Sequence, residues 1–544
     1  MKSRQPVRDV PVVRSGRRES LALWVFIGYL VLAGLLILFR LGSYHWFFGD
    51  EWSFLAERDG FNLQDLFRSH GEHWVTLPII SYRILYSLFG LHSYLPYQAV
   101  LVASHLACAG LLRIVMRRAG VGPWVATLVA SVFVLLGPGE ENIVWAFQIT
   151  LVFALMFGMC HLVLSDHDGL LDRRDWFGLL AGLAGLMSSG LSLVMIPVVG
   201  LAVFIRRGWR LALFHTAPLG AVYLVWLLLS NPEGIPNPYG RSATISEIIT
   251  FVWSGVLAGL QTIGGSLGNG LLLSVVLLIG LALIGKTDSN WRRIGTSAAL
   301  FTGALMFLAG SSYSRWYVAA VIDQQSRYLY LLVAFGLPLC AVAADAIISR
   351  WRPLAPLILL PFGVALVLNL DGFGARAPWT AAYHQRQQET ILLMAHSDLA
   401  QQVPGDVRPN IWFTIGWLRE ALRANKVPSP PVGAESWADE LPLLLVAAQR
   451  KDKVSGKCSI IAAGTILETR AGEIVGFKFD VPPAPETPFF EQNVLVFERI
   501  GDAGSPIGFI GFSESFGATL EFAVDGLRLA PHAASPSQKL LLCR

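Results

Sequence analysis

Long apolar runs alternate with short polar turns over roughly the first 370 residues of this 544-residue chain. A helix needs about 20 mostly apolar residues to cross a bilayer, and runs of this kind recur throughout this part. Residues 75–91 and 246–264 are also apolar, but charges and glycines interrupt them, so we expect both to lie at the outer surface. The alternative is that both cross, which makes thirteen spans. The pattern predicts eleven spans, at residues 21–39, 94–115, 122–137, 143–164, 176–188, 191–206, 210–230, 268–285, 294–311, 326–349 and 353–370.

Basic residues cluster in alternate turns of this pattern, and this sets the expected orientation. Turns rich in Lys and Arg stay in the cytoplasm. The first run lacks a small-x-small cleavage site after it, so we interpret it as an uncleaved span and not as a signal peptide. The N-terminus is then cytoplasmic and the C-terminus lies outside. The residues concerned are Lys2, Arg4, Arg8, Arg14, Arg17, Arg18, Arg113, Arg117, Arg118, Arg173, Arg174, Arg206, Arg207, Arg210, Lys286, Arg292, Arg293, Arg350 and Arg352.

Composition excludes several classes of protein. Apolar residues make up 54% of the chain and charged residues 15%, against about 25% charged in soluble domains. A soluble globular protein and a disordered chain are therefore excluded. A net charge of +4 is too small to indicate a nucleic-acid partner, and five cysteines are too few for a disulfide-dense scaffold. We expect three parts: a basic N-terminus (1–20), a membrane core (21–370) and an α+β domain outside the membrane (371–544).

The first outer loop contains two adjacent carboxylates among many aromatic side chains. A belt of rings at the membrane interface explains aromatics such as Trp52, with stacking on sugar rings as the alternative. The belt does not explain Asp50 and Glu51. Their mutual repulsion and lost hydration are expected to raise their pKa values, which suits proton abstraction. His73 and Glu72 follow in the same loop, and we expect them to hydrogen-bond to the acidic pair, since their spacing matches no usual zinc pattern.

Two further outer segments carry charges at the membrane edge. Glu140 and Glu141 open the segment after residue 137, where acidic residues also favour a helix N-terminus. Arg315 and Arg327 lie on the outer side, where the positive-inside rule does not place arginines. They are suited to binding a phosphate, with a salt bridge to a carboxylate as the alternative. A divalent cation bridging the loop carboxylates is the alternative to a site that requires no metal.

The composition changes after residue 370. Residues 378–400, 413–425 and 439–450 have the pattern of amphipathic helices, and alternating strands follow from residue 458. We expect a small antiparallel sheet or sandwich behind the helices. Cys458 and Cys543 bracket the strands in an oxidising compartment, which predicts a disulfide between them, with two independent thiols as the alternative.

A many-span core with a carboxylate motif in its first outer loop resembles the GT-C superfamily of membrane glycosyltransferases. Asp50-Glu51 resembles the Asp-Glu pair of protein O-mannosyltransferases and the first-loop aspartate of aminoarabinose transferases. Arg327-Tyr328 resembles the late arginine and tyrosine that bind the lipid phosphate in several members. The resemblance covers about residues 20–370 and implies a GT-C-like helical core.

The resemblance also implies an activity and its partners. The donor would be a polyprenyl-phosphate-linked sugar, and the acceptor a glycan, lipid or protein outside the cytoplasm. Asp50 would be the base with Glu51 as its partner or substitute, and Arg327, then Arg315, would hold the leaving phosphate. The location would be a bacterial plasma membrane. The rival functions are a lipid-sugar transporter or flippase, which the lack of internal repeats disfavours, and a non-catalytic membrane scaffold.

Overall fold

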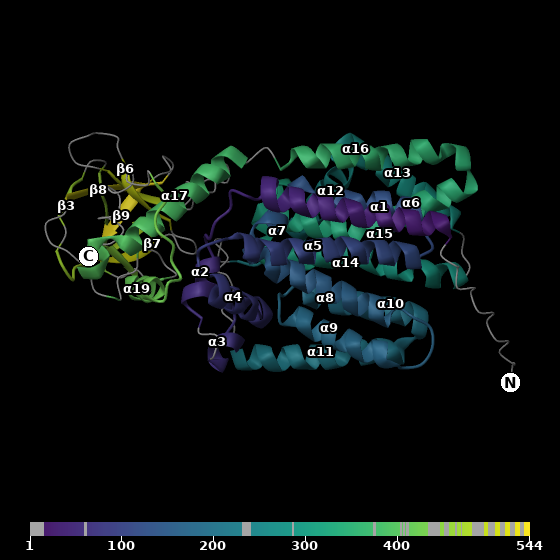
Figure 1. The fold of residues 1–544 in the computed structure, drawn as a ribbon, viewed down its shortest axis with the longest axis horizontal. Coiled ribbons are helices and arrows are strands. Elements are labelled where there is room, and N and C mark those ends of the chain that lie inside the picture. Colours follow the sequence, from purple (N-terminus) through teal and green to yellow (C-terminus); the bar gives the residue numbers. More distant parts are fainter. Residues whose placement is uncertain are drawn as a thin grey trace.

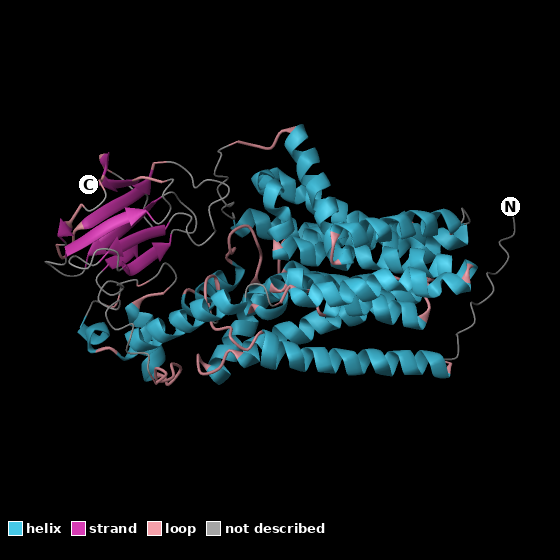
Figure 2. Ribbon diagram, turned by 90° about the horizontal axis from the view of Figure 1, so that it is seen from above, coloured by secondary structure: helices cyan, strands magenta, loops and turns pink. Residues whose placement is uncertain are grey.

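The computed structural model describes residues 16–58, 62–230, 241–284, 288–373, 377–402, 405, 409, 413–432, 447–450, 456–462, 465–468, 470–480, 494–498, 506–511, 517–522, 528–533 and 538–544. An elongated bundle of helices is followed by a region of strands beyond one of its ends (Figure 1). Helices and strands are clearly segregated (Figure 2). The expected fold class, a many-helix membrane protein with a C-terminal strand-containing region, is confirmed.

The helices follow the apolar runs of the sequence. Short π- and 3₁₀-helical segments adjoin several of them: η1 (Ile37–Leu41), η2 (Gly137–Gly139), η3 (Ala146–Gln148), η4 (Trp316–Gln324) and η5 (Arg352–Leu354). The α-helices are α1 (Arg17–Leu36), α2 (Glu51–Ala56), α3 (Leu63–Phe67), α4 (Thr76–Phe89), α5 (Leu95–Arg118), α6 (Pro123–Val134), α7 (Glu141–Val144), α8 (Ile149–Ser165), α9 (Arg173–Leu186), α10 (Ser192–Arg207), α11 (Trp209–Ser230), α12 (Ile245–Gly264), α13 (Leu267–Leu283), α14 (Asp288–Arg315), α15 (Ser326–Arg350), α16 (Ala355–Asp371), α17 (Ala377–His396), α18 (Asp398–Gln402) and α19 (Ile415–Arg423).

The number of full-length spans differs from the eleven expected. In the described part of the chain, eight helical stretches are long and apolar enough to cross a membrane. Seven of them correspond to expected spans. The other four expected spans form the shorter helices α6, α9, α10 and α13, of 12, 14, 16 and 17 residues. Broken or short helices are tolerated at membrane depth where other helices surround them, and α9 and α10 are separated at Ser188-Ser189-Gly190 as the sequence indicates.

Helix α12 is the eighth stretch, and it covers residues 246–264, the segment expected at the outer surface. The glycines that suggested an interrupted segment are contact positions within one continuous helix. A Cβ on Gly255 would lie 2.4 Å from Leu308 of α14, and one on Gly259 would lie 3.4 Å from Leu332 of α15. Small residues let membrane helices approach closely, so these glycines allow packing and do not end the helix. The other interrupted segment forms α4, a helix of 14 residues that lies beside α2 and α3 at one end of the bundle (Figure 1).

The two ends of the bundle carry different charges. At one end, which we call the basic end, Arg206 bonds to Asp166 (2.7 Å) and Arg207 to the fully buried Asp175 (2.5 Å). Helices α2, α3 and α4 group at the opposite end, beside α17 and α19 (Figure 1). We call this the site end, because it gathers the outer-loop residues singled out from the sequence.

The strands form two antiparallel sheets around a shared apolar core. Their orders are β1-β7-β4-β9-β2 and β3-β8-β5-β6. The core takes residues from both sheets, among them Val475, Phe477 and Leu495. Residues 447–450 form β1, so the helix expected over 439–450 is wrong at its end, where pairing with β7 outweighs the local helical pattern. The strands are β1 (Ala447–Arg450), β2 (Cys458–Ile460), β3 (Leu467–Glu468), β4 (Ile474–Phe479), β5 (Val494–Glu498), β6 (Pro506–Gly511), β7 (Gly517–Phe522), β8 (Arg528–Ala533) and β9 (Leu540–Cys543).

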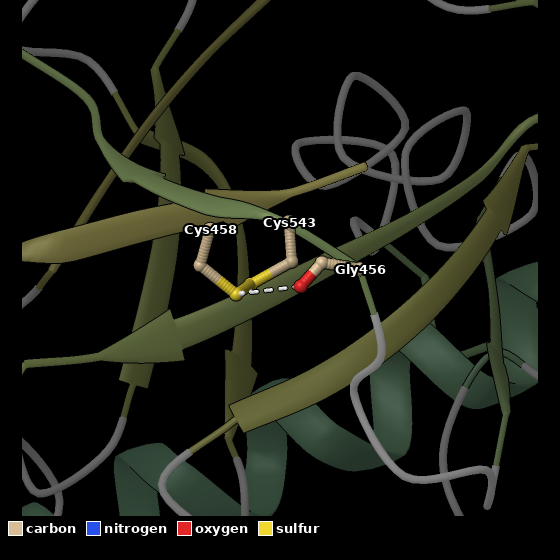
Figure 3. Close-up of a disulfide and its surroundings, with 3 residues drawn as sticks. All are labelled: Gly456, Cys458 and Cys543. Carbon is tan, nitrogen blue, oxygen red and sulfur yellow. Dashed lines mark hydrogen bonds between the residues drawn. A yellow bond between two sulfur atoms is a disulfide. The ribbon is translucent and has the colours of Figure 1, made fainter.

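A disulfide joins Cys458 of β2 to Cys543 of β9, the pairing expected from the sequence (Figure 3). The two residues are direct partners in the antiparallel register of these strands. The last strand of the chain is therefore fixed to the second by both hydrogen bonds and a covalent link.

Replacing Cys458 and Cys543 together by serine should destabilise the strand region by about 4 kcal/mol, because the cross-link closes a loop of 85 residues. Limited proteolysis against temperature measures the change, and Cys160→Ser, a free half-buried cysteine, is the control. Alkylation of both thiols in unreduced protein would contradict the assignment.

Candidate active site

Asp50 lies at the start of α2, directly after a sharp turn of the first outer loop. Gly49 adopts a positive φ of 58°, a conformation that favours glycine. Asp50 follows as the N-cap residue of α2, and its side chain is half-buried. The turn therefore presents the Asp50 carboxylate at the edge of the site end, while the next residue points into the protein.

Glu51 is fully buried, and four donors surround its carboxylate. One oxygen accepts from the hydroxyls of Tyr82 (2.6 Å) and Tyr94 (3.1 Å). The other accepts from the backbone N–H of Phe48 (3.0 Å) and from Nε1 of Trp145 (3.2 Å). A carboxylate has about four lone-pair sites, so Glu51 has none left for a substrate hydroxyl. Its contacts join α2 to α4, to the start of α5 and to the second outer loop.

Burial determines the protonation of Glu51. Loss of hydration raises the pKa of this carboxyl from 4.5 to about 7, and the hydrogen bonds from Tyr82, Phe48, Tyr94 and Trp145 counteract only part of that rise. The pKa of Tyr82 is raised well above its ordinary value, again mainly by burial. The tyrosines therefore keep their protons and act as donors to Glu51.

Trp145 connects the two halves of the site. Its indole donates to Glu51 and stacks on Phe48 at a centroid distance of 4.6 Å. A Cβ on Gly49 would lie 3.5 Å from the same ring. The Arg327 guanidinium lies 5.2 Å from the centre of the same ring. The ring thus contacts both the loop that carries Asp50 and the arginine expected to bind phosphate.

Arg327 is held by the second outer loop. Its Nη2 lies 2.7 Å from Oε1 of Glu141, and its Nε donates to the same oxygen at 2.8 Å. Gln148 donates to that oxygen at 3.3 Å, and the Ser326 hydroxyl accepts from the backbone N–H of Glu141. The Arg327 side chain remains 43% exposed, so solvent screens the ion pair. An incoming phosphate can therefore compete with Glu141 for the guanidinium.

Arg315 forms a second cation beside the first loop. It bonds to Glu72 at 3.2 Å, with its side chain 33% exposed. Burial lowers the pKa of the neighbouring His73; the negative charge of Glu72 opposes this effect, and the positive charges of Arg315 and Arg327 add to it. The lowered pKa favours the neutral form of His73. A Cβ on Gly190 would lie 2.8 Å from Nδ1 of His73, so the turn between α9 and α10 closes over this ring.

Arg58 shapes the loop that carries Glu72 and His73, and no sequence pattern singled it out. Its buried guanidinium donates to the backbone carbonyls of Asp65, Arg68 and Ser69 at 2.7–2.9 Å. His70 and His73 then pair through their backbones across a tight turn at Gly71, whose φ is 55°. The hydrogen bonds of Arg58 thus position this part of the loop.

The structure brings most of the sequence-predicted residues to the site end. Trp52, by contrast, is 1% exposed and packs against Phe413 and Trp417 in the core. Tyr328 packs between Phe251 and Phe307. Sequence reasoning assigns no role to Tyr82, Tyr94, Trp145 or Gln148, because their importance depends on contacts with residues far away in the chain.

The carboxylates at the site end do not form a metal site in the described residues. Among the described residues, the one cluster with three converging ligands lies at the basic end and consists of His167, Asp172 and Asp175. In that cluster Arg207 already neutralises Asp175. At the site end, four donors occupy Glu51 and an arginine occupies Glu141, so these oxygens do not fit a bridging cation.

Comparison with known protein families finds no match, and neither does comparison with curated proteins. Among solved structures, the fold is similar to ArnT from Cupriavidus metallidurans in the apo state, with 14% identity, a TM-score of 0.46 and coverage of 77% of this chain and 91% of that chain. It is also similar to ArnT bound to undecaprenyl phosphate, with 15% identity, a TM-score of 0.44 and coverage of 76% and 91%. We base the functional proposal on the residues of this chain.

Replacing Glu51 by alanine should destabilise the protein by at least about 3 kcal/mol, because four buried donors lose their acceptor. Asp50→Asn should change stability by less than about 1 kcal/mol, since Asp50 lies at the edge. Thermal unfolding in one lipid environment at one scan rate compares the two. Equal transition temperatures for the two variants would contradict the structural role of Glu51.

The raised pKa of Glu51 predicts a pH dependence of stability. The folded protein holds this proton more tightly than the unfolded chain, so the stabilisation is complete below pH 4.5 and is lost as the pH rises through about 7. Between pH 5 and 8 the wild type should lose up to about 3 kcal/mol relative to Glu51→Gln, which cannot titrate. Parallel pH profiles of the two proteins would contradict this prediction, because they would show that the pKa of Glu51 is close to its ordinary value.

Proposed function

We propose that this chain is an inverting glycosyltransferase that moves a sugar from a polyprenyl-phosphate donor to an acceptor outside the cytoplasm. One observation carries the proposal. The loop that carries the half-buried Asp50 and the half-exposed Arg327 both contact the ring of Trp145, at one end of an apolar bundle. This arrangement offers a base and a phosphate-binding cation at the membrane surface.

The two adjacent carboxylates have different roles in this proposal. Glu51 is a positioning residue, since its oxygens are occupied by donors from α4, α5 and the two outer loops. It holds the turn at Gly49, and with it Asp50. Asp50 is the catalytic base, because it is the member of the pair at the protein surface.

The reaction follows from these positions. The Asp50 carboxylate accepts the proton of an acceptor hydroxyl, whose oxygen attacks the anomeric carbon of the donor sugar. The bond between that carbon and the phosphate oxygen breaks on the opposite face, which inverts the configuration. Polyprenyl phosphate leaves with the bonding electron pair.

The arginines stabilise the leaving group. Charge grows on the phosphate in the transition state, and a fixed guanidinium close to it lowers the barrier without reorganising solvent. Arg327 is the first candidate because Glu141 and Trp145 fix its position while leaving it partly exposed. Arg315, bonded to Glu72, is the second. Neutral His73 beside them adds no further charge.

The remaining details rest on the resemblance in the Asp50-Glu51 and Arg327-Tyr328 motifs. They are the polyprenyl carrier, the acceptor class (a glycan, lipid or protein) and a bacterial plasma membrane with the site end facing outward. We propose a reaction without a bound metal, and activity that survives EDTA would agree with this. A flippase needs no base, so the half-buried carboxylate of Asp50 favours transfer.

The proposal is tested by deleting the gene and rescuing the strain with wild type, Asp50→Asn or Asp65→Asn at matched expression. Mass spectrometry of the cell-envelope glycans, lipids and proteins should show one sugar that disappears on deletion. Wild type and Asp65→Asn, an acid in the same loop outside the site, should restore it. Asp50→Asn should restore less than about 1% of the initial rate, because a general base contributes 10²–10⁴-fold.

Two results would contradict the proposal. Full restoration by Asp50→Asn would show that this carboxylate is not the base, and a scaffold or flippase would then explain the chain better. Unchanged glycans in the deletion strain would remove the transferase assignment itself. A comparison of protein levels in the membrane fraction shows that each variant is present.

A further inference from the structure

A cavity of about 490 Å³ lies between the end of α1, the start of α5 and helix α17. Small-molecule sites in proteins typically have volumes of 300–1,000 Å³. One wall is the π-helical segment η1, where the backbone N–H of Gly42 bonds to the carbonyl of Ile37. Such π-segments often occur at functional sites. The functional proposal above does not use this cavity.

One part of the cavity wall is polar and carries no formal charge. It is formed by the side chains of Ser43, His92, Ser93, Gln385 and Gln388. Among the described residues that line the cavity, none is Asp, Glu, Lys or Arg. Hydroxyl and amide groups both donate and accept hydrogen bonds. This lining suits a neutral ligand rich in hydroxyl groups and offers nothing to compensate a phosphate or a carboxylate.

Another part of the wall is apolar. Leu38 and Phe39 come from η1, which continues α1, and Leu95 comes from the first turn of α5. Phe39 is 61% exposed and Leu95 is 39% exposed, although both are large apolar residues. The cavity therefore combines a polar wall with apolar side chains at the end of two membrane helices.

Two tyrosines connect this cavity to the candidate active site. Tyr94 lines the cavity and donates its hydroxyl proton to Glu51 at 3.1 Å. Tyr44 also lines it, and burial together with the negative charge of Glu140 raises the pKa of Tyr44 to about 12. A ligand in the cavity would thus be separated from the Asp50-Glu51 turn by a single tyrosine side chain.

We propose that this cavity binds an uncharged carbohydrate and that this carbohydrate is part of the glycosyl acceptor. Binding follows from the polar, uncharged wall. The role as acceptor rests on the proposed function, because only a transferase has an acceptor. The carbohydrate is either the headgroup of a lipid, with its chain against Leu38 and Phe39, or a free sugar.

Photo-crosslinking with a neutral probe tests the proposal. The full-length protein in lipid nanodiscs is incubated with octyl β-glucoside that carries a diazirine in its alkyl chain, below its micellar concentration. After irradiation, mass spectrometry should find the label on peptides that contain residues 38–46 and 381–388. Unlabelled octyl glucoside should compete for this labelling, whereas octyl phosphate should not.

Two adjacent alanines on α17 give a matched pair of variants. Ala381 lines the cavity, so Ala381→Trp should fill it and reduce labelling at least tenfold. Ala382 is exposed and is not among the lining residues, so Ala382→Trp should label like wild type. Gln388→Leu, a milder change, should weaken labelling two- to tenfold, the usual effect of one lost hydrogen bond. Thermal unfolding of each variant monitors folding.

The possible outcomes test carbohydrate binding in the cavity separately from the proposed transferase function. Competition by free glucose as well as octyl glucoside identifies a free sugar as ligand, and competition by octyl glucoside alone identifies a lipid-linked one. Equal labelling of Ala381→Trp and wild type, or equal competition by octyl phosphate, overturns the proposal. Probe binding needs no turnover. If the deletion strain keeps its envelope glycans while labelling persists, the transferase function fails and the carbohydrate site stands.

Discussion

The enclosure of the Glu51 carboxylate is the constraint on which the site end depends. A buried carboxylate is costly unless donors surround it, and here four donors do so from separate segments. Meeting that requirement fixes α2 against α4, α5 and the second outer loop together. The short helices around the site are too small to be stable alone. The hydrogen bonds to Glu51, together with the aromatic packing around them, therefore determine where Asp50 and Trp145 lie.

The burial of Glu51 also explains how two adjacent acidic residues, Asp50 and Glu51, can both be accommodated. Adjacent residues at the start of a helix point in different directions, so Glu51 enters the interior while Asp50 stays at the edge. Partial neutralisation of Glu51 through its raised pKa reduces the repulsion between them. Arg327, paired with Glu141, lies against the Trp145 ring and provides the opposite charge. The end of the bundle thus brings the loop that carries Asp50 and a cation to the same aromatic ring.

Sequence reasoning could find the charged residues of this site, but it could not find their partners. Asp50-Glu51 stood out because adjacent acids among aromatics are unusual, and Arg327 because it lies on the side where arginines are not expected. The difference between Asp50 and Glu51 depends on Tyr82, Tyr94 and Trp145, which are 31, 43 and 94 positions from Glu51. Arg327 and Glu141 are 186 positions apart. The glycines of α12 suggested an interrupted segment for the same reason. Only the neighbouring side chain of Leu308 shows that Gly255 allows packing and does not break the helix.

Binding of polyprenyl phosphate to the purified protein in nanodiscs tests the central claim most directly, because it separates the cation from the base. The affinity is measured for wild type, for Asp50→Asn and for a variant with Arg315 and Arg327 both replaced by glutamine. The account predicts that wild type and Asp50→Asn bind equally and that the double arginine variant binds at least tenfold more weakly, since charge-assisted contacts to phosphate are lost. Equal affinity of the arginine variant and wild type would contradict the assignment of these residues to the leaving phosphate, and with it the proposed reaction.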